Sequence, residues 1–463
     1  MLKQYSQLFV IALVLTFVVS CGGQSSQEEQ SISQLSEASA QSEETATARP
    51  TALVLTATPL PPTEEATDAA VSDDATSEST ATPSPTATIF PTATAVPAEW
   101  LTPAAHAPDV QQPPYVVSEC SDRFPCNEDV EAWEERIRVP EGFEASYFAY
   151  LPNPEHLDRA LQLTSLTFGP DGLLYVATTR GDIYAIDQNG KATLFADGLI
   201  VPTGLAFQPG TEKLYISNRV LDLNIDGEGQ VSVIENGVIS TLFDGLPCCY
   251  VGMHGPNGIA FGPDGYGYVG VGGRADHGEI LDGSNMPDEM QPLEATILRF
   301  NPDGSEVEPY AFGFRNPYDI SWDADGRLFA TDNGRDGEVA DELHIVEPGA
   351  QHGYPYFDCP ACLGIPDDVD LVETFHDFTP HAVATGIVTY LDNKFPGYYN
   401  SQFLTLWTAM DFAERVMRFL PDGSNSTFAT GFAAPIDLTV GPDGALYVAD
   451  YATGIIFKIA HTD

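Results

Sequence analysis

A short unit recurs along this 463-residue chain and limits its fold more than any other feature. In each copy an apolar residue is followed by Gly-Pro-Asp-Gly, or a variant of it, and then by an alternating strand. Because proline fixes φ and glycine accepts positive φ, each copy predicts a tight turn that joins two antiparallel strands. The copies begin at Phe168, Phe207, Phe261, Trp322 and Val440.

The spacing of these units predicts a propeller. The starts lie roughly 40 to 60 residues apart, except for a longer gap between Trp322 and Val440. That gap has room for a degenerate unit whose strands are residues 386–391 and 402–407. Repeats of four short strands at this period are typical of all-β propellers, and the count predicts a six-bladed β-propeller. A helical pattern precedes it near residues 128–136.

The start of the chain predicts export. Residues 1–20 contain one lysine and an apolar run that is short for a membrane span, which indicates a signal peptide. The Val-Val-Ser-Cys ending resembles a bacterial lipoprotein signal and implies lipidation of Cys21; an ordinary signal or an uncleaved anchor is the alternative. Residues 21–114 are rich in Ser, Thr, Ala and Pro and predict a disordered stalk. Residues 115–463 then form the propeller domain.

The charge excludes some partners. The formal net charge of −48 argues against nucleic acid and against anionic membrane surfaces, so we expect membrane contact through the lipid anchor only. The expected location is extracytoplasmic, at the cell surface or in the periplasm. Six of the seven cysteines then meet an oxidising compartment. Proximity suggests Cys120–Cys126, Cys248–Cys249 and Cys359–Cys362, although the sequence leaves the connectivity open.

Loops on one face of a propeller converge on its axis, so candidate site residues come from distant positions. His254 lies in a Gly/Pro loop before a hairpin and is a candidate general base. A lone loop histidine is more often a surface or packing residue, but Arg315 and Asn316 at the next blade favour a site. The run from Asp332 to Glu342 offers many oxygen ligands of the kind that Ca²⁺ binds; the alternative is a polar loop without a ligand.

Several segments in order resemble the glucose/sorbosone dehydrogenase family of six-bladed propellers. They are HGPNGIAFGPDG, GFRNPYDISWDADGRLFATDNG, DELHIVEPGAQHGYP, HAVATGIVTY and PIDLTVGPDGALYVAD. The resemblance implies pyrroloquinoline quinone (PQQ) as cofactor, His254 as the base, and Arg315 with Asn316 against cofactor and substrate. It also implies Ca²⁺ held by the backbone carbonyls of Gly334 and Arg335, with Asp332 close by.

The sequence departs from the family pattern at two places. Where the family has an aspartate that orients the base, this chain has Gly273, and Asp276 is the nearest substitute. Where the family holds the three-carboxylate quinone with Lys and Arg from the last two blades, this chain has Phe412, Ala413, Ala434 and Ile436. Arg274 and Arg415 are candidate replacements, and a Cys248–Cys249 ring is a candidate platform for a flat cofactor.

Three functions follow as alternatives. The first is an exported, lipid-anchored, PQQ-dependent aldose dehydrogenase that passes electrons from a sugar to an external acceptor. The second is a Ca²⁺-dependent hydrolase like the gluconolactonases, centred on Asn257, Asn316 and Asp332. The third is a non-catalytic propeller that binds a carbohydrate or a protein. The missing basic anchors favour the third, and His254 with Arg315 and Asn316 favours the first.

Overall fold

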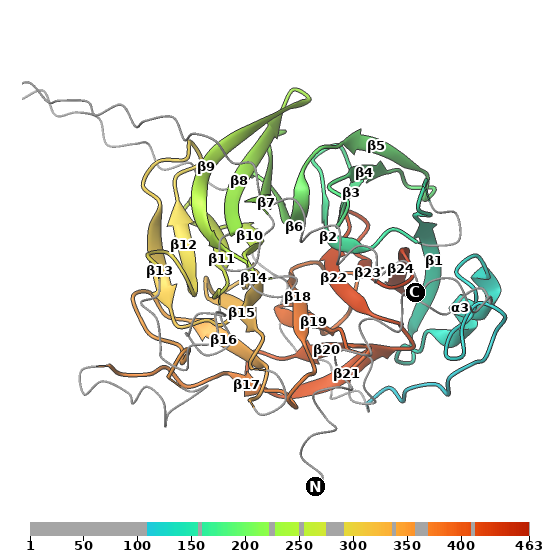
Figure 1. The fold of residues 1–463 in the computed structure, drawn as a ribbon. Coiled ribbons are helices and arrows are strands. Elements are labelled where there is room, and N and C mark those ends of the chain that lie inside the picture. Colours follow the sequence, from blue (N-terminus) through green and yellow to red (C-terminus); the bar gives the residue numbers. More distant parts are fainter. Residues whose placement is uncertain are drawn as a thin grey trace, which may run out of the picture. The chain divides into compact units, whose positions relative to one another are not determined.

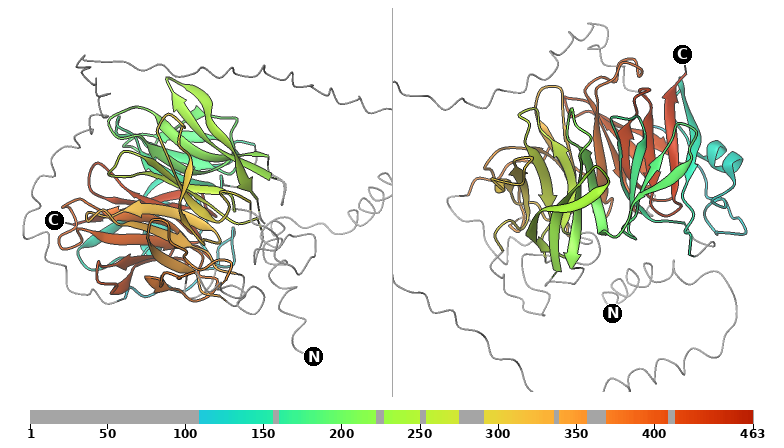
Figure 2. Two further views of the ribbon diagram at one scale, coloured as in Figure 1. Left: turned by 90° about the vertical axis from the view of Figure 1, so that its left-hand side faces the viewer. Right: turned by 90° about the horizontal axis from the view of Figure 1, so that it is seen from above.

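The computed structural model describes residues 109–155, 160–221, 227–249, 254–274, 291–335, 339–356, 369–408 and 413–462. Their strands form six four-stranded antiparallel sheets, which confirms the predicted six-bladed propeller (Figure 1). The single helix in these ranges, α3 (Val130–Arg136), packs against β1 on the outside of the last sheet (Figure 2). No helix in the described part of the chain has the length and apolar character to cross a bilayer.

The blades follow the chain, with the first strand of each blade innermost. Their strands are β2 (Leu163–Phe168), β3 (Leu174–Thr178), β4 (Ile183–Ile186) and β5 (Ala192–Ala196); β6 (Ile200–Phe207), β7 (Leu214–Leu221), β8 (Gly227–Glu235) and β9 (Val238–Cys248); β10 (Pro256–Phe261), β11 (Gly267–Val271), β12 (Thr296–Phe300) and β13 (Glu308–Phe312); β14 (Pro317–Trp322), β15 (Leu328–Asp332), β16 (Glu342–Val346) and β17 (His376–Asp377); β18 (Ala384–Tyr390), β19 (Ser401–Leu406), β20 (Arg415–Phe419) and β21 (Asn425–Thr430); and β22 (Pro435–Val440), β23 (Leu446–Asp450), β24 (Ile455–His461) and β1 (Phe143–Tyr150).

The last blade is closed by the N-terminal strand. β1 pairs antiparallel with β24, with Phe143 opposite His461 and Tyr150 opposite Ile455. The two ends of the propeller therefore share one sheet, and the ring closes through main-chain hydrogen bonds (Figure 1). The sequence did not predict this strand as the outer strand of the last blade.

The apolar core is divided into six clusters, one between each pair of neighbouring blades. Close approach of the innermost strands depends on glycine. A Cβ added at Gly258 would lie 2.5 Å from the Cα of Asp319, and one at Gly386 would lie 2.5 Å from the Cα of Asp437. Because real Cβ atoms do not approach so closely, any side chain at either position would push two blades apart.

The Pro-Asp-Gly turns all lie at one end of the blades. The β2–β3 hairpin turns at Gly169–Gly172, where the Gly172 amide donates to the Gly169 carbonyl at 2.9 Å. The opposite end, where the innermost strands begin and the second strands finish, carries the loops around His254 and Arg315. We call this face the mouth of the propeller.

Candidate functional site

His254 lies at the mouth, two residues before β10, and is only 7% exposed. Its Nδ1 lies 3.1 Å from the carbonyl oxygen of Gly273. Because a carbonyl only accepts, Nδ1 carries the proton and Nε2 is the basic nitrogen of the ring. Burial, followed by the positive charges of Arg315 and Arg219, holds the pKa of His254 well below its ordinary value. The imidazole is therefore neutral, as a general base requires.

Arg315 and Asn316 form a buried corner immediately before β14. The Arg315 and Asn316 amides donate to the two carboxylate oxygens of Asp332, at 2.9 and 2.6 Å. The Asn316 side-chain oxygen accepts from Nδ2 of Asn257 at 2.8 Å. Asn257 belongs to β10, so this hydrogen bond joins the blade that carries His254 to the blade that carries Arg315. The structure thus brings the three principal predicted residues to one face.

The guanidinium of Arg315 is directed at main-chain oxygens. Its Nη1 donates to the carbonyls of Asn333 and Gly334, both at 2.9 Å. The Gly334 amide in turn donates to Asp341 at 3.0 Å, which fixes this loop. The Gly334 carbonyl, predicted with that of Arg335 to hold Ca²⁺, therefore already faces a cation. A calcium ion there would need Arg315 to move, because like charges at this distance repel each other.

Asp332, also predicted near the metal, holds the Arg315–Asn316 corner in place. Its carboxylate accepts the two amides of the Arg315–Asn316 corner and is 3% exposed. Burial raises the pKa of Asp332 to about 7, while those amide hydrogen bonds and His344 oppose that rise. Asp332 thus orients the corner through these two amides.

The predicted partners on the third blade are placed only in part. Arg274 donates from its backbone amide and Nε to the carboxylate of Glu294, at 2.7 and 3.0 Å. Glu294 is 5% exposed, so this is a buried ion pair at the end of the blade rather than a cation directed at the axis. Asp276 lies outside the described residues, as does Phe412.

The adjacent cysteines form a disulfide, as do Cys120 and Cys126, which confirms two of the suggested pairs. Cys248 ends β9, and its Sγ lies 3.8 Å from the carbonyl oxygen of His254. Both Cys248 and Cys249 are at most 1% exposed. The ring therefore contacts the main chain of His254, and it is too buried to present an open platform. Cys21, Cys359 and Cys362 lie outside the described residues.

A family model described as glucose / sorbosone dehydrogenase matches residues 216–458, which is more than half of the chain. The chain belongs to the glucose/sorbosone dehydrogenase family. At the level of the family it is therefore a sugar dehydrogenase, an oxidoreductase. No individually curated protein matches the chain.

Solved structures of sugar dehydrogenases share the fold. A putative oxidoreductase (glucose dehydrogenase) from Thermus thermophilus is 22% identical with a TM-score of 0.53, over 69% of this chain and 100% of that one. The PQQ-bound aldose sugar dehydrogenase of Streptomyces coelicolor is 20% identical with a TM-score of 0.53, over 70% and 99%. The apo form of the soluble aldose sugar dehydrogenase of Escherichia coli is 16% identical with a TM-score of 0.55, over 69% and 99%.

In this member of the glucose/sorbosone dehydrogenase family, apolar side chains occupy the positions of the last two blades where the family pattern has cations. Ala413, Ala434 and Ile436 are buried apolar side chains. Arg415 donates to the carbonyl of Ala413 at 3.1 Å and to Thr427 at 3.4 Å, so it lies along its own blade. Arg418 packs over the ring of Tyr398, 3.7 Å from the centroid, away from the mouth.

Aromatic side chains stand at the mouth of these two blades instead. Trp407 follows β19 and Tyr451 follows β23, with ring centroids 5.5 Å apart. Both pack against the cluster that contains the buried Tyr318 of β14. Among the described residues, Tyr318 Oη, Trp407 Nε1 and both amide atoms of Asn333 are buried without a hydrogen-bond partner. Such atoms are costly in a folded protein and indicate a place for a polar ligand.

Arg219 is a site residue that the sequence analysis missed. It lies near the mouth end of β7 and is 6% exposed. Ser217, two residues earlier, contacts the Asn257 carbonyl, and side chains two apart share one face of a strand. Arg219 therefore faces the His254 loop. Its charge helps to lower the pKa of His254 and opposes the rise that burial causes in the pKa of Tyr318. The alternation of inward and outward side chains along β7 could have pointed to Arg219 in the sequence.

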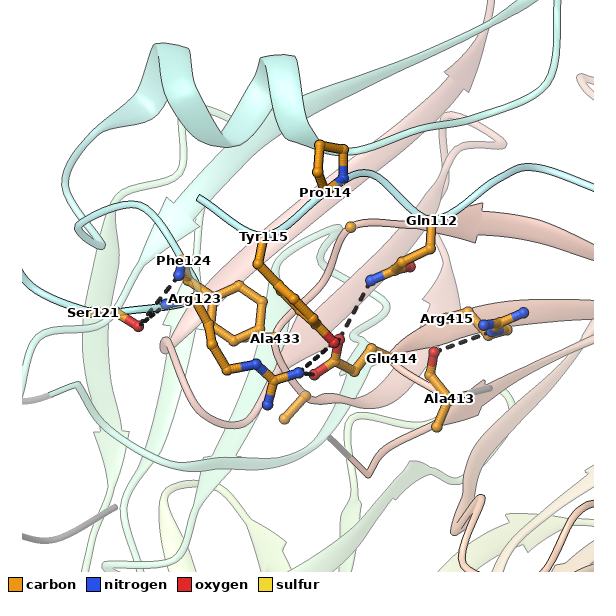
Figure 3. A network of polar contacts seen from close by, with 12 residues as sticks. Gln112, Pro114, Tyr115, Ser121, Arg123, Phe124, Ala413, Glu414, Arg415 and Ala433 are labelled. Atoms are coloured by element: carbon orange, nitrogen blue, oxygen red, sulfur yellow. Dashed lines mark hydrogen bonds and ion pairs between the residues drawn. The ribbon is translucent and has the colours of Figure 1, made fainter. Parts of the chain in front are cut away.

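The segment that precedes α3 anchors itself at the mouth end of β20. The fully buried carboxylate of Glu414 accepts from Arg123 at 2.9 Å, from Tyr115 at 3.1 Å and from Gln112 at 3.3 Å (Figure 3). The Arg123 guanidinium also lies over the Tyr115 ring, 4.2 Å from its centroid. Burial raises the pKa of Glu414 to about 7, although Arg123 opposes the rise.

We expect Arg123→Ala to destabilise the folded protein by about 3 kcal/mol at pH 8, because it leaves a buried carboxylate without its ion partner. At pH 5 the loss should be much smaller, since a pKa of about 7 makes Glu414 neutral there. Urea unfolding at the two pH values measures this. Arg180→Ala, which breaks an exposed pair with Glu155, should change stability by less than about 0.5 kcal/mol at either pH. Equal losses for Arg123→Ala at both values would contradict the charge argument.

Proposed function

We propose that this protein is an exported, PQQ-dependent aldose dehydrogenase that oxidises the anomeric carbon of a sugar to the lactone. The observation that carries the proposal is the state of His254: a buried, neutral imidazole whose Nδ1–H is held by the Gly273 carbonyl, with Nε2 as the basic nitrogen. Membership of the glucose/sorbosone dehydrogenase family and a PQQ-bound relative of the same fold support it.

The residues of blades 2 to 4 fit an anionic, planar, polar cofactor. Two buried guanidinium groups, those of Arg219 and Arg315, raise the positive potential around His254. The buried amide of Asn333 and the hydroxyl of Tyr318, both without partners among the described residues, offer donors of the kind a carboxylate or carbonyl oxygen accepts. On blades 5 and 6, Trp407 and Tyr451 offer ring faces in place of the expected cations.

In the proposed reaction His254 Nε2 takes the proton of the anomeric hydroxyl as the carbon–oxygen double bond forms. A bound quinone supplies the two-electron acceptor for the hydride that leaves the same carbon. Arg315 holds a positive charge beside the developing negative charge, and Asp332 keeps Arg315 and Asn316 in place through their amides. We assign no step to Ca²⁺, because the Gly334 carbonyl accepts from Arg315. The two electrons must then pass to an external acceptor.

The export route is part of the proposal. Cleavage before Cys21 and lipidation of its thiol would anchor the chain to a membrane, with the Ser/Thr/Pro-rich residues that follow as a spacer. Cys21→Ser should therefore move the protein from the membrane fraction of expressing cells to the soluble fraction. A variant that stays with the membrane would argue for an uncleaved anchor instead.

The first test is calorimetric titration of the protein with PQQ, with and without Ca²⁺. We expect one equivalent to bind with a dissociation constant of about 1 µM or tighter, and turnover with aldoses to follow. Arg219→Gln should weaken that binding, whereas Arg180→Gln, a change at an exposed surface pair, should not. Calcium dependence would show that Arg315 releases the Gly334 carbonyl when the cofactor is bound.

One observation favours a second candidate function, a propeller that binds a carbohydrate without oxidising it. Ala413, Ala434 and Ile436 stand where the family pattern has cations on the last two blades, and aromatic rings with buried donors at a mouth also suit a neutral sugar. Absence of PQQ binding at high micromolar concentration, together with measurable sugar binding, would replace the dehydrogenase proposal with this one.

A further inference from the structure

Blade 4 contains a group of three ligand-type side chains on adjacent strands. Asp332 ends β15 and lies directly opposite Glu342, the first residue of β16. His344, two residues further along β16, shares the face of Glu342. One potential ligand atom from each of the three lies within 4.8 Å of the other two, and Glu342 Oε2 is 3.1 Å from His344 Nε2.

The equivalent aspartate of blade 6, Asp450, is stabilised by hydrogen bonds. Asp450 ends β23 as Asp332 ends β15, and its Oδ2 accepts the amides of Ala433 and Ala434 at 2.7 and 2.9 Å. The other carboxylate oxygen of Asp450 accepts from the amide and hydroxyl of Thr453, at 3.1 and 2.9 Å. In blade 6, therefore, amide and hydroxyl donors satisfy both carboxylate oxygens of the aspartate that ends the second strand.

In blade 4 the two amide donors are kept, but a second carboxylate and an imidazole take the place of Thr453. Asp332 is 3% exposed, His344 is fully buried, and the Glu342 side chain is 16% exposed. Asp341, itself 2% exposed, adds a further carboxylate next in sequence. No lysine or arginine of the described ranges makes an ion pair with Asp332 or Glu342. This group of buried and partly buried carboxyl side chains, unlike its counterpart in blade 6, leaves a place for a cation.

His344 adds a second and independent observation. Its ring is fully buried against Phe314 and His352, with centroids 5.4 Å away in both cases. Its Nδ1 has no hydrogen-bond partner among the described residues, although a buried ring nitrogen normally finds one. A fully buried histidine that contacts one carboxylate through Nε2 and lies close to a second has the donor chemistry of a metal ligand.

We propose that Asp332, Glu342 and His344 bind a divalent transition-metal ion such as Zn²⁺ or Mn²⁺, with water in the remaining positions. Neighbouring ligand atoms around such an ion are roughly 3 to 3.5 Å apart, so the group needs shifts of only about 1 Å to close. The imidazole favours these metals over Ca²⁺ and Mg²⁺, which prefer oxygen alone. The partly exposed Glu342 provides the route from solvent.

Asp332 also links the proposed metal site to the Arg315–Asn316 corner at the mouth. Its two carboxylate oxygens accept the amides of Arg315 and Asn316, and hydrogen-bonded carboxylates of this kind orient metal ligands. The ion would therefore connect the outer part of blade 4 to the corner at the mouth and brace it. This role is positioning, and it stands whether or not the protein binds a quinone.

The test is metal titration of the purified full-length protein after treatment with a chelator. Co²⁺ serves as a spectroscopic probe through its visible absorption, and Zn²⁺ competition gives the affinity. We expect the wild type to bind one equivalent, and Glu342→Gln and His344→Gln each to weaken binding by at least about 10-fold. Glu342→Gln keeps the size and an acceptor oxygen, so it should fold even if His344→Gln does not.

The matched control is His376→Gln, in the outer strand β17 of the same blade, which should bind the metal as the wild type does. Zn²⁺ should also raise the melting temperature of the wild type and of His376→Gln, but not that of Glu342→Gln. Failure of the wild type to bind one equivalent would overturn the proposal, as would equal affinity in Glu342→Gln. Neither readout involves PQQ or sugar, so this test is separate from that of the dehydrogenase function.

Discussion

His254→Ala is expected to abolish sugar oxidation while PQQ binding stays close to that of the wild type. The alanine variant keeps the contact between Cys248 and the main chain of residue 254, but it removes the basic nitrogen that takes the hydroxyl proton. Loss of a positioned general base lowers turnover by roughly 10²- to 10⁴-fold. Steady-state oxidation of an aldose by protein saturated with PQQ measures this, alongside calorimetric titration of the cofactor.

The pH profile separates a base from a structural histidine. Burial and the charges of Arg315 and Arg219 hold the pKa of His254 well below 6.5, so the ring stays neutral as the pH falls through that value. The acid limb of kcat/KM for the wild type should therefore lie below pH 6.5 and should be absent in the residual activity of the variant. His461→Ala, at the end of β24, is the control and should keep full activity. Full turnover by His254→Ala would remove the residue from the mechanism.

The blades could be predicted from the sequence because each depends on a local signal. A Pro-Asp-Gly turn with flanking alternation specifies a hairpin wherever it occurs. The degenerate unit lacks this turn, but the gap in the spacing of the other units placed it correctly, as β18 and β19. The last blade shows the limit of such signals. β1 has no turn of this kind beside it, and its partner β24 lies at the other end of the chain, so nothing near residues 143–150 indicated the pairing.

For the candidate site, the sequence likewise predicted some features and missed others. His254, Arg315 and Asn316 could be predicted because short motifs mark them, and the propeller ring brings such loops to one face. The direction of a side chain within that face could not be predicted. Arg315 turns to the carbonyls of Asn333 and Gly334, and Arg274 turns to Glu294. These choices depend on contacts between residues far apart in space, for which no motif exists.

The positive charge of the mouth is also distributed differently from the expectation. The family pattern predicted cations on the last two blades. The structure instead has buried alanine and isoleucine there, with Trp407 and Tyr451 near them. The buried cations, Arg219 and Arg315, lie on the second and fourth blades on either side of His254. A carboxylate-bearing ligand would therefore place its charged end toward blades 2 to 4 and its ring toward blades 5 and 6.

Arg315→Ala is expected to weaken both the fold and the binding of PQQ. The substitution leaves the buried carbonyl of Asn333 and the partly buried carbonyl of Gly334 without their donor, and losing hydrogen bonds to a charged group in this setting costs about 2–4 kcal/mol. It also removes one of the two guanidinium groups near His254, so an anionic cofactor should bind at least about 10-fold more weakly. Urea unfolding and calorimetric titration measure the two effects separately.

Two further variants make this result specific. Arg315→Lys keeps the charge but not the planar fork, so it should retain part of the cofactor affinity and recover little of the lost stability. Arg299→Ala, which breaks a surface pair with Glu308, should change neither property by more than about 0.5 kcal/mol. If Arg315→Ala lost stability but bound PQQ as the wild type does, Arg315 would be a support for the loop at Gly334 and nothing more. Within the described part of the chain, Arg219 would then be the buried guanidinium that remains to attract an anionic cofactor to His254.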